Sequence, residues 1–366
     1  MNTTAGGRAD AAREGRIDGP APTRPYAVGA EGGGGVDAAG MAVLACCAVW
    51  ALVCAAGRDA RPDGTLLALL AVTAGYAAGR VLGALLPVLT PAAGALTVLA
   101  LVLLPPSRLS SGRHAPPLGY HNADAALLVL AVGAACCAAW GAPGAVSRAA
   151  LWLVAAGAAV AALALGSAAG FAAGVATLLC SLAASRVRRR ALGLAGLAAA
   201  AVLAVGASYA VAVNALPGGL SESLTGQLTQ PRVQLWHQAV TLVRHHPLRG
   251  VGPERFAEAS EPLPSDTPIA DTPQSAPFQS APFQLAAEQG IPGAVLLGAA
   301  YTWTLCSLGR SPRPTPVVLT AAASLTGLAL LATVDHVLSY AAVTAAAGLL
   351  AGLAASRPLT DPSPPT

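Results

Sequence analysis

A short glycine-containing segment, PLRGVGPERF at residues 247–256, is the part of the sequence best suited to binding an anion. Gly250 and Gly252 flank a valine, and a proline after them stiffens the turn. Because glycine has no side chain, the backbone N–H groups around it stay accessible and can form a nest for an anion. Arg249 and Arg255 stand on either side and would add positive charge. The alternative is an ordinary turn, which the same residues also fit.

The residues before this turn predict an amphipathic helix. Thr229 can cap the helix start, and Pro231 falls in its first turn, where a missing N–H costs nothing. Pro247 ends the helix. A stripe of this kind can lie on a bilayer or on a bundle of transmembrane helices. The apolar residues that form the stripe recur every three or four residues: Val233, Trp236, Val240 and Val243.

The rest of the sequence supplies the framework that would position the turn, and its composition is that of a membrane protein. Hydrophobic residues make up 55% of the 366 residues and charged residues only 10%, whereas a soluble domain carries roughly a quarter charged residues. The apolar residues come in blocks long enough to cross roughly 30 Å of hydrocarbon. We therefore predict an all-α fold, a polytopic transmembrane helix bundle of about ten spans with one large extracytoplasmic loop. The predicted spans are 38–56, 64–79, 82–104, 121–140, 145–165, 167–184, 191–213, 285–306, 316–334 and 337–355.

The arginines predict the orientation of this bundle. The chain has 21 Lys and Arg residues, and all of them are arginine. Cytoplasmic loops are enriched in basic residues, so the segment SRVRRR at 185–190, between the sixth and seventh spans, is placed in the cytoplasm. Counting spans from this loop places both termini in the cytoplasm. The same count places residues 214–284 outside, together with 105–120 and the turn Asp335-His336.

These assignments divide the chain into five parts. Residues 1–36 are rich in Gly, Pro, Arg and Asp and are predicted to be a disordered cytoplasmic tail. Residues 37–213 hold transmembrane helices 1–7, and residues 214–284 form the extracytoplasmic functional loop. Residues 285–356 hold transmembrane helices 8–10, and 357–366 form a second cytoplasmic tail.

The cysteines and the net charge argue against two classes of site. Each of the seven cysteines lies within an apolar block without the spacing of metal ligands, so we interpret them as packing residues. We expect no metal and no other cofactor. The formal net charge of +4 is modest and gives no reason to expect a nucleic-acid partner, which would need a clustered basic surface.

Several segments, taken in order, resemble the O-antigen ligase and O-antigen polymerase family of membrane glycosyltransferases. The sharpest are RVQLWHQA, HPLRGVGPERF and FQLAAEQGIPG, which all lie within residues 232–293. PLGYHNADAALL at 117–128 is similar to that family's external Asn-bearing loop, and GSAAG at Gly166 occupies the place of its SRG motif. The similarity in order and topology covers residues 110–350.

The resemblance implies transfer of glycan from a polyprenyl-diphosphate carrier to an acceptor hydroxyl in cell-surface polysaccharide assembly. Its partners would be that lipid-linked glycan, the lipid bilayer and other glycan assembly proteins, in the cytoplasmic (plasma) membrane of a bacterium. The departing diphosphate needs its charge neutralised, and arginine can grip phosphate oxygens through two parallel hydrogen bonds. Arg232 matches the family's arginine, and we group it with Arg249 and Arg255 as the predicted diphosphate-binding residues. Without the resemblance, Arg232 is read as a surface residue of its helix.

The chain departs from the family pattern at two positions that bear on catalysis. Members usually carry a histidine before the LAAEQG-like segment, suited to taking the acceptor's proton, and residues 274–284 contain none. The arginine of the SRG motif is also absent, because Ala168 follows Ser167. Glu288 and His246 are therefore the candidate catalytic bases. A carboxylate near an apolar interface can have its pKa raised toward neutral pH. The alternatives are a dipole-stabilised glutamate at a helix start and a solvated histidine at a helix end.

Two functions from different classes stay open. The first is the glycosyltransferase, ligase or polymerase, with another base in place of the histidine or with weakened or lost activity. The second is a non-catalytic accessory or a transporter of a cell-envelope glycan pathway. Transporters tend to place ionisable residues inside spans, whereas Glu288 and Asp335 are predicted at span ends and the spans are otherwise nearly free of charge. This distribution disfavours ion-coupled transport but not an accessory role.

Overall fold

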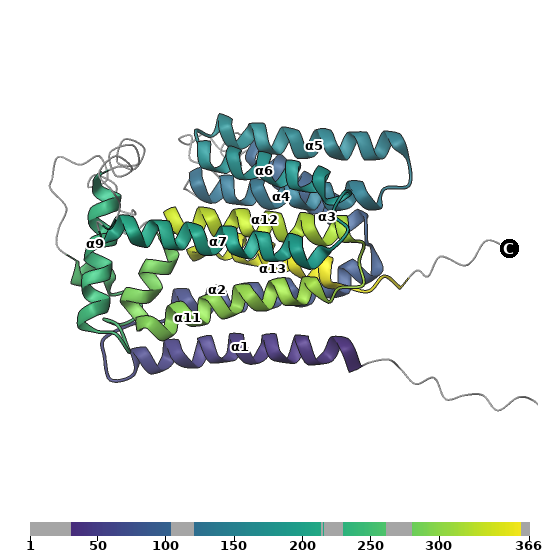
Figure 1. The fold of residues 1–366 in the computed structure, drawn as a ribbon. Helices are drawn as coiled ribbons and strands as arrows, with labels where there is room; N and C mark the ends of the chain where they lie inside the picture. The colour runs from purple at the N-terminus through teal and green to yellow at the C-terminus, as the bar shows by residue number, and fades with distance from the viewer. Residues whose placement is uncertain (1–30, 104–120, 214, 216–229, 261–279, 360–366) are drawn as a thin grey trace, which may run out of the picture.

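The computed structural model describes residues 31–103, 121–213, 215, 230–260 and 280–359, and this part of the chain is helical with short connections (Figure 1). No β-strand occurs in these ranges. The long helices of the bundle are α1 (Glu31–Ala55), α2 (Asp63–Leu85), α3 (Leu89–Leu103), α4 (His121–Gly141), α5 (Ala145–Ala164), α6 (Ala168–Ala184), α7 (Arg190–Ala212), α11 (Ala281–Gly309), α12 (Thr315–Val334) and α13 (Ala341–Ala355). Between them lie α9 (Gln230–His245), α10 (Phe256–Ala259) and the 3-10 helix η2 (Val337–Ser339).

Each predicted span overlaps one of the long helices, but the boundary predicted between 64–79 and 82–104 is wrong, because α2 continues through it to Leu85 and α3 begins only at Leu89. Seven helices in the described residues are long and apolar enough to cross a membrane, namely α1, α2, α4, α5, α7, α11 and α12. The helices α3, α6 and α13 are apolar but shorter. The protein is therefore an all-helical, multi-pass membrane protein. The number of ten spans and the extracytoplasmic placement of residues 214–284 stay predictions.

The first helix begins earlier than the composition indicates. We assigned residues 1–36 to a disordered tail, but α1 starts at Glu31, so residues 31–36 are helical. The start of α1 is held against α11, because the indole N–H of Trp303 donates to the carbonyl oxygen of Val36 at 2.9 Å. Tertiary contact therefore supports helix in a segment whose own residues favour disorder. Residues 1–30 of the predicted tail lie outside the described residues.

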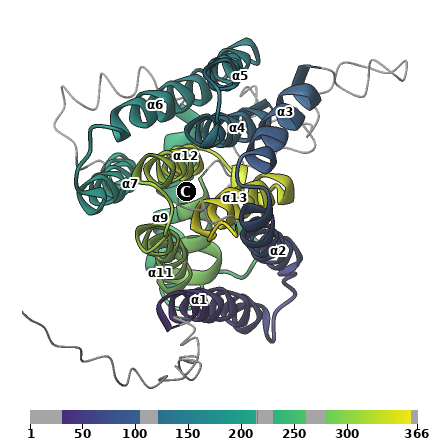
Figure 2. The same cartoon turned by 90° about the vertical axis from the view of Figure 1, so that its right-hand side faces the viewer.

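The centre of the bundle is formed by α4 and α12. In the most apolar stretch of each helix, 83% of the residues are buried in α4 and 78% in α12, against at most 28% in the other candidate spans. Seen along the helices, α4 and α12 lie between α5 and α6 on one side and α11 and α1 on the other (Figure 2). Polar residues near their ends, such as Asp124 in α4 and Thr333 in α12, are buried in the protein and therefore shielded from lipid.

The helices α2 and α13 pack especially closely because both present glycine to the contact. A side chain at Gly75 or Gly79 would overlap the backbone of α13, and one at Gly348 or Gly352 would overlap the backbone of α2. Small residues of this kind let two backbones approach, which stabilises helix pairs in a membrane where apolar burial alone does not.

One end of the bundle is covered by α9, which lies across the long helices (Figure 1). The bounds Gln230–His245 confirm the helix that the cap, the stripe and Pro247 predict. Its stripe faces the protein, because Trp236 is buried and stacks on Phe283 with ring centroids 5.6 Å apart. The apolar cluster between α9 and the bundle also includes Leu235, Ala239, Val240, Phe256, Ala212 and Ala287. The helix is thus fixed to the start of α11.

Candidate functional site

The candidate site is built around a break in α11. At Gly290 the backbone has φ 73° and ψ −174°, which is not helical, and Pro292 follows two residues later. An intact helix would bond the N–H of Ile291 to the carbonyl of Ala287, and that of residue 292 to the carbonyl of Glu288. Proline has no N–H to give. The break therefore leaves two carbonyl oxygens and one N–H of α11 in need of other partners.

The turn after α9 supplies these partners. Its backbone runs beside the break and forms one hydrogen bond with each of these three unpaired groups of α11, the two carbonyl oxygens and the N–H. Such groups are costly to bury unpaired, so each segment stabilises the conformation of the other. The bonds are Val251 N–H to Ala287 O at 2.9 Å, Gly252 N–H to Glu288 O at 2.9 Å, and Ile291 N–H to Pro247 O at 2.8 Å.

These bonds decide between the two interpretations of the glycine segment. The N–H groups of Val251 and Gly252 bond to α11, and that of Gly250 bonds to His246 O at 3.1 Å. Gly250 and Gly252 have φ of 58° and 110°, values that favour glycine. A side chain at Gly250 would also overlap the backbone of Ala287 and Glu288. The segment is therefore a structural turn, and its N–H groups do not form the open anion nest that we considered.

Two arginines join this turn to the end of α1. The guanidinium of Arg249 donates to the carbonyl oxygens of Val53 and of Ala56, the latter at 3.0 Å. Arg58 donates to the carbonyl of Gly250 at 2.8 Å. The last carbonyls of a helix carry partial negative charge, which suits these contacts. Arg249 is therefore engaged with the protein itself, and we did not identify Arg58 from the sequence. Its one sequence signal is its place directly after the first predicted span.

The Glu288 carboxylate lies between α11 and the end of the turn. The residue is 3% exposed, and Gln284 Nε2 donates to Glu288 Oε1 at 3.2 Å. Hydrogen bonds from the backbone of Glu254 and of Phe256 also reach the carboxylate. Its position is thus set by donors from both segments. A carboxylate held in this way has a defined direction in which it can accept a proton.

The other predicted site residues are less enclosed. Arg255 pairs with Glu258, with Nε and Oε2 3.1 Å apart, and both side chains are substantially exposed. His246 is exposed just after α9. Arg232 lies in the first turn of α9, but the structure does not describe its side chain. Gln274 and Gln279 lie outside the described residues. The structure therefore brings Glu288, Arg249, Gly250 and Gly252 into one contact region, with Arg255 and His246 beside it in the chain.

A cluster of polar residues that the sequence did not predict to be in contact lies where α4 begins and α12 ends. Asn122 Nδ2 donates to Asp335 Oδ2 at 2.5 Å, and the backbone N–H of His336 donates to Asp335 Oδ1 at 2.8 Å. Asp124 and Asp335 are buried. Val334, adjacent to Asp335, packs on the apolar cluster that holds α9. The predicted Asn-bearing segment and the Asp335-His336 turn are thus joined next to the cover formed by α9.

Comparison with known proteins bears on this region of the chain. The family model described as O-Antigen ligase matches residues 149–298. The matched range runs from α5 to the part of α11 just beyond its break, so it contains α9, the turn and Glu288. No curated protein matches the chain.

Proposed function

Since residues 149–298 match the O-Antigen ligase family model, we propose that the chain is a membrane glycosyltransferase that uses a polyprenyl-diphosphate-linked glycan. The acceptor is a hydroxyl group of a cell-envelope glycan or glycolipid. The protein works in the cytoplasmic membrane of a bacterium, with both termini in the cytoplasm and residues 214–284 on the outer side. The arginine-bearing loop at 185–190 supports this orientation.

The observation that carries the proposal is the contact between Glu288 and the turn after α9. A glycosyl transfer of this type needs a proton acceptor for the attacking hydroxyl and positive charge for the departing diphosphate. Glu288 is a fixed carboxylate, and the adjoining segments carry Arg232, Arg249 and Arg255. Residue types suited to both requirements therefore occur within one stretch of the matched range, which supports the proposal.

In the proposed reaction the acceptor oxygen attacks the anomeric carbon of the carrier-linked sugar. The bond from that carbon to the diphosphate oxygen breaks, and the diphosphate leaves with the electron pair. The hydroxyl proton passes to the carboxylate of Glu288, which takes the place of the histidine missing from 274–284. His246 is the alternative base, since it is exposed and follows α9 directly.

The arginines have unequal parts in this proposal. Arg249 donates to two carbonyls of α1 and chiefly positions the turn. Arg255 has a partly exposed side chain and pairs with the surface carboxylate of Glu258, so it can turn toward a diphosphate at little cost. Arg232 is assigned the main diphosphate contact, because it matches the family's arginine.

The test is turnover of a lipid-linked glycan by the purified full chain in nanodiscs, followed as release of polyprenyl diphosphate in the presence of acceptor. We expect release by the parent protein and its loss in Glu288→Gln. Asp63→Asn is the control, since Asp63 is an exposed carboxylate at the start of α2, at the same end of the bundle as the turn. Full activity of Glu288→Gln would remove Glu288 as the base.

One observation favours a second function, a non-catalytic accessory of glycan assembly. Residues 274–284 contain no histidine, and Glu288 is closed in by Gln284 and by the backbone of the turn. An accessory would bind the lipid-linked glycan without consuming it. Retention of the labelled carrier by the parent protein, with no release of diphosphate over a range of acceptors, would establish this second function instead.

A further inference from the structure

A pocket of about 620 Å³ is lined by residues from the start of α1 and from the ends of α11 and α13. These helix ends lie at the end of the bundle opposite α9 (Figure 1). Among the described residues, its charged lining consists of Arg80, Arg190, Arg310, Arg357 and one acid, Asp37. Four positive charges against one negative charge leave three positive charges uncompensated within the lining. Such a concentration of arginine attracts an anion.

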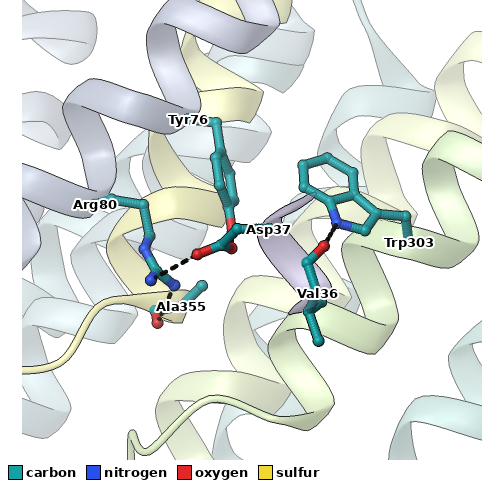
Figure 3. A network of polar contacts seen from close by, with 6 residues as sticks. All are labelled: Val36, Asp37, Tyr76, Arg80, Trp303 and Ala355. Carbon is teal, nitrogen blue, oxygen red and sulfur yellow. Dashed lines mark hydrogen bonds and ion pairs between the residues drawn. The ribbon is translucent and has the colours of Figure 1, made fainter. Parts of the chain in front are cut away.

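The carboxylate of Asp37 already has an ion-pair partner and a hydrogen-bond partner within the protein. Arg80 Nη2 lies 2.9 Å from Asp37 Oδ2, and the hydroxyl of Tyr76 donates to Asp37 Oδ1 at 2.8 Å (Figure 3). The second terminal nitrogen of Arg80 donates to the carbonyl of Ala355 at 2.8 Å. Both carboxylate oxygens therefore have partners on α2, and Asp37 does not neutralise the other arginines of the pocket.

The remaining arginines keep unused donors. Arg190 Nη1 donates to the carbonyl of Ser311 at 2.8 Å, which leaves most of its five N–H groups available. Arg310 and Arg357 are exposed, and neither guanidinium has a hydrogen bond or ion pair with the described part of the chain. A guanidinium presents two parallel donors that match the oxygens of a phosphate group.

The pocket lies too far from the turn after α9 and Glu288 for an anion bound in it to be the carrier diphosphate of the proposed reaction. From Asp37 to Ala55, α1 spans about 27 Å at its rise of about 1.5 Å per residue. That length is close to the hydrocarbon thickness of a bilayer, roughly 30 Å. The turn after α9 contacts the end of α1, so it and the pocket lie at opposite membrane surfaces.

We propose that this pocket binds the phosphate group of an anion, supplied by the head group of an anionic phospholipid in the leaflet that surrounds it. The proposal does not depend on the glycosyltransferase activity. The pocket lies where the helices meet the membrane surface, and the arginine count of the loops places this surface in the cytoplasm, where the leaflet carries anionic lipid. A soluble phosphate has the same binding chemistry, and the experiment separates the two sources.

The experiment removes Arg310 and Arg357, the two lining arginines whose side chains have no partner in the described part of the chain. The full chain, purified in detergent, is titrated with phosphatidylglycerol, with phosphatidylcholine and with inorganic phosphate, and bound molecules are counted by native mass spectrometry. We expect the variant Arg310→Gln/Arg357→Gln to bind phosphatidylglycerol about tenfold more weakly than the parent. The charge-matched control is Arg188→Gln/Arg189→Gln, which removes two exposed arginines of the neighbouring loop outside the pocket.

The outcomes separate a lipid head group from a soluble phosphate, and they also test whether the site exists. Selective loss of phosphatidylglycerol binding in the pocket variant, with phosphatidylcholine unaffected, assigns the site to a lipid. Inorganic phosphate bound by the parent and control but not by the pocket variant, without lipid selectivity, upholds the anion site and assigns it to a soluble phosphate. Equal losses in the two double variants, or no loss in either, would overturn the proposal, because general surface charge or no site at all would then explain the binding. Unchanged circular dichroism shows that the variants are folded.

Discussion

Gly250 and Gly290 allow the turn after α9 and the break in α11 to pack closely, because each glycine lies against the backbone of the other segment. A side chain at Gly250 would overlap Ala287 and Glu288, and a side chain at Gly290 would overlap Pro247 and Leu248. Both glycines also have positive φ. The glycine turn and the break in α11 are thus one structural unit, and Glu288 owes its position to it.

The first prediction concerns this close packing of the turn against α11. Gly290→Ala should lower the stability of the protein by about 1–3 kcal/mol, since it combines a strained backbone with a clash against Leu248. Gly298→Ala is the control on the same helix, because a Cβ there meets open space. Thermal unfolding in detergent measures the difference. Equal midpoints for the two variants would mean that the segments do not pack as described.

The second prediction concerns Arg58, which links the end of α1 to the turn. Arg58→Gln removes the hydrogen bond to Gly250 O and should destabilise the turn by about 1–3 kcal/mol. Hydrogen exchange of the peptide 247–256 should then accelerate, since Val251 and Gly252 donate to α11. Arg61→Gln, at an exposed position nearby, should leave exchange unchanged. Acceleration by both variants would point to a general charge effect.

The third prediction concerns the diphosphate contact. Arg232→Lys keeps the positive charge but loses the planar pair of donors, so turnover should fall about tenfold or more while the protein stays folded. Arg188→Lys, in the loop assigned to the cytoplasm, should have no effect on release of polyprenyl diphosphate. Parent-like turnover by Arg232→Lys would exclude Arg232 from the site.

The fourth prediction concerns the missing histidine. If Glu288 is an imperfect replacement, the parent should be slow, and a histidine at Gln274, Gln279 or Gln284 should raise turnover in at least one single variant, by up to about a hundredfold. Asparagine at the same position is the control, because it adds no base. A fast parent protein, with Glu288→Gln harmless and no histidine variant faster, would contradict this account and make His246 the next candidate.

The fifth prediction concerns orientation. A cysteine at Ser265, within the predicted external loop, should react with a membrane-impermeant maleimide in intact cells, above the background of the native cysteines. A cysteine at Ser185, in the predicted cytoplasmic loop, should react only after lysis. The opposite pattern would reverse the topology and place Glu288 at the cytoplasmic surface.

The sequence by itself predicted most of the helices and indicated the family whose model matches residues 149–298. A membrane-spanning helix satisfies its backbone hydrogen bonds internally, so its existence is visible in a local apolar run. The predicted spans 121–140 and 145–165 differ from α4 and α5 by one residue each. The cap and stripe likewise predicted α9. The ordered motifs of 232–293 indicated the family that the match over residues 149–298 confirms.

The tertiary structure alone decided how the candidate site is held. The anion-nest interpretation of Gly250 and Gly252 depended on free backbone N–H groups. Those of Val251 and Gly252 donate to α11, which is remote in sequence, and that of Gly250 donates to His246 O. Arg58 and the pair Asn122–Asp335 were missed for the same reason, since their contacts join residues 192 and 213 positions apart. Local sequence encodes hydrogen bonds that close within a helix, whereas a broken helix leaves polar groups whose partners are chosen by the packing of the whole chain.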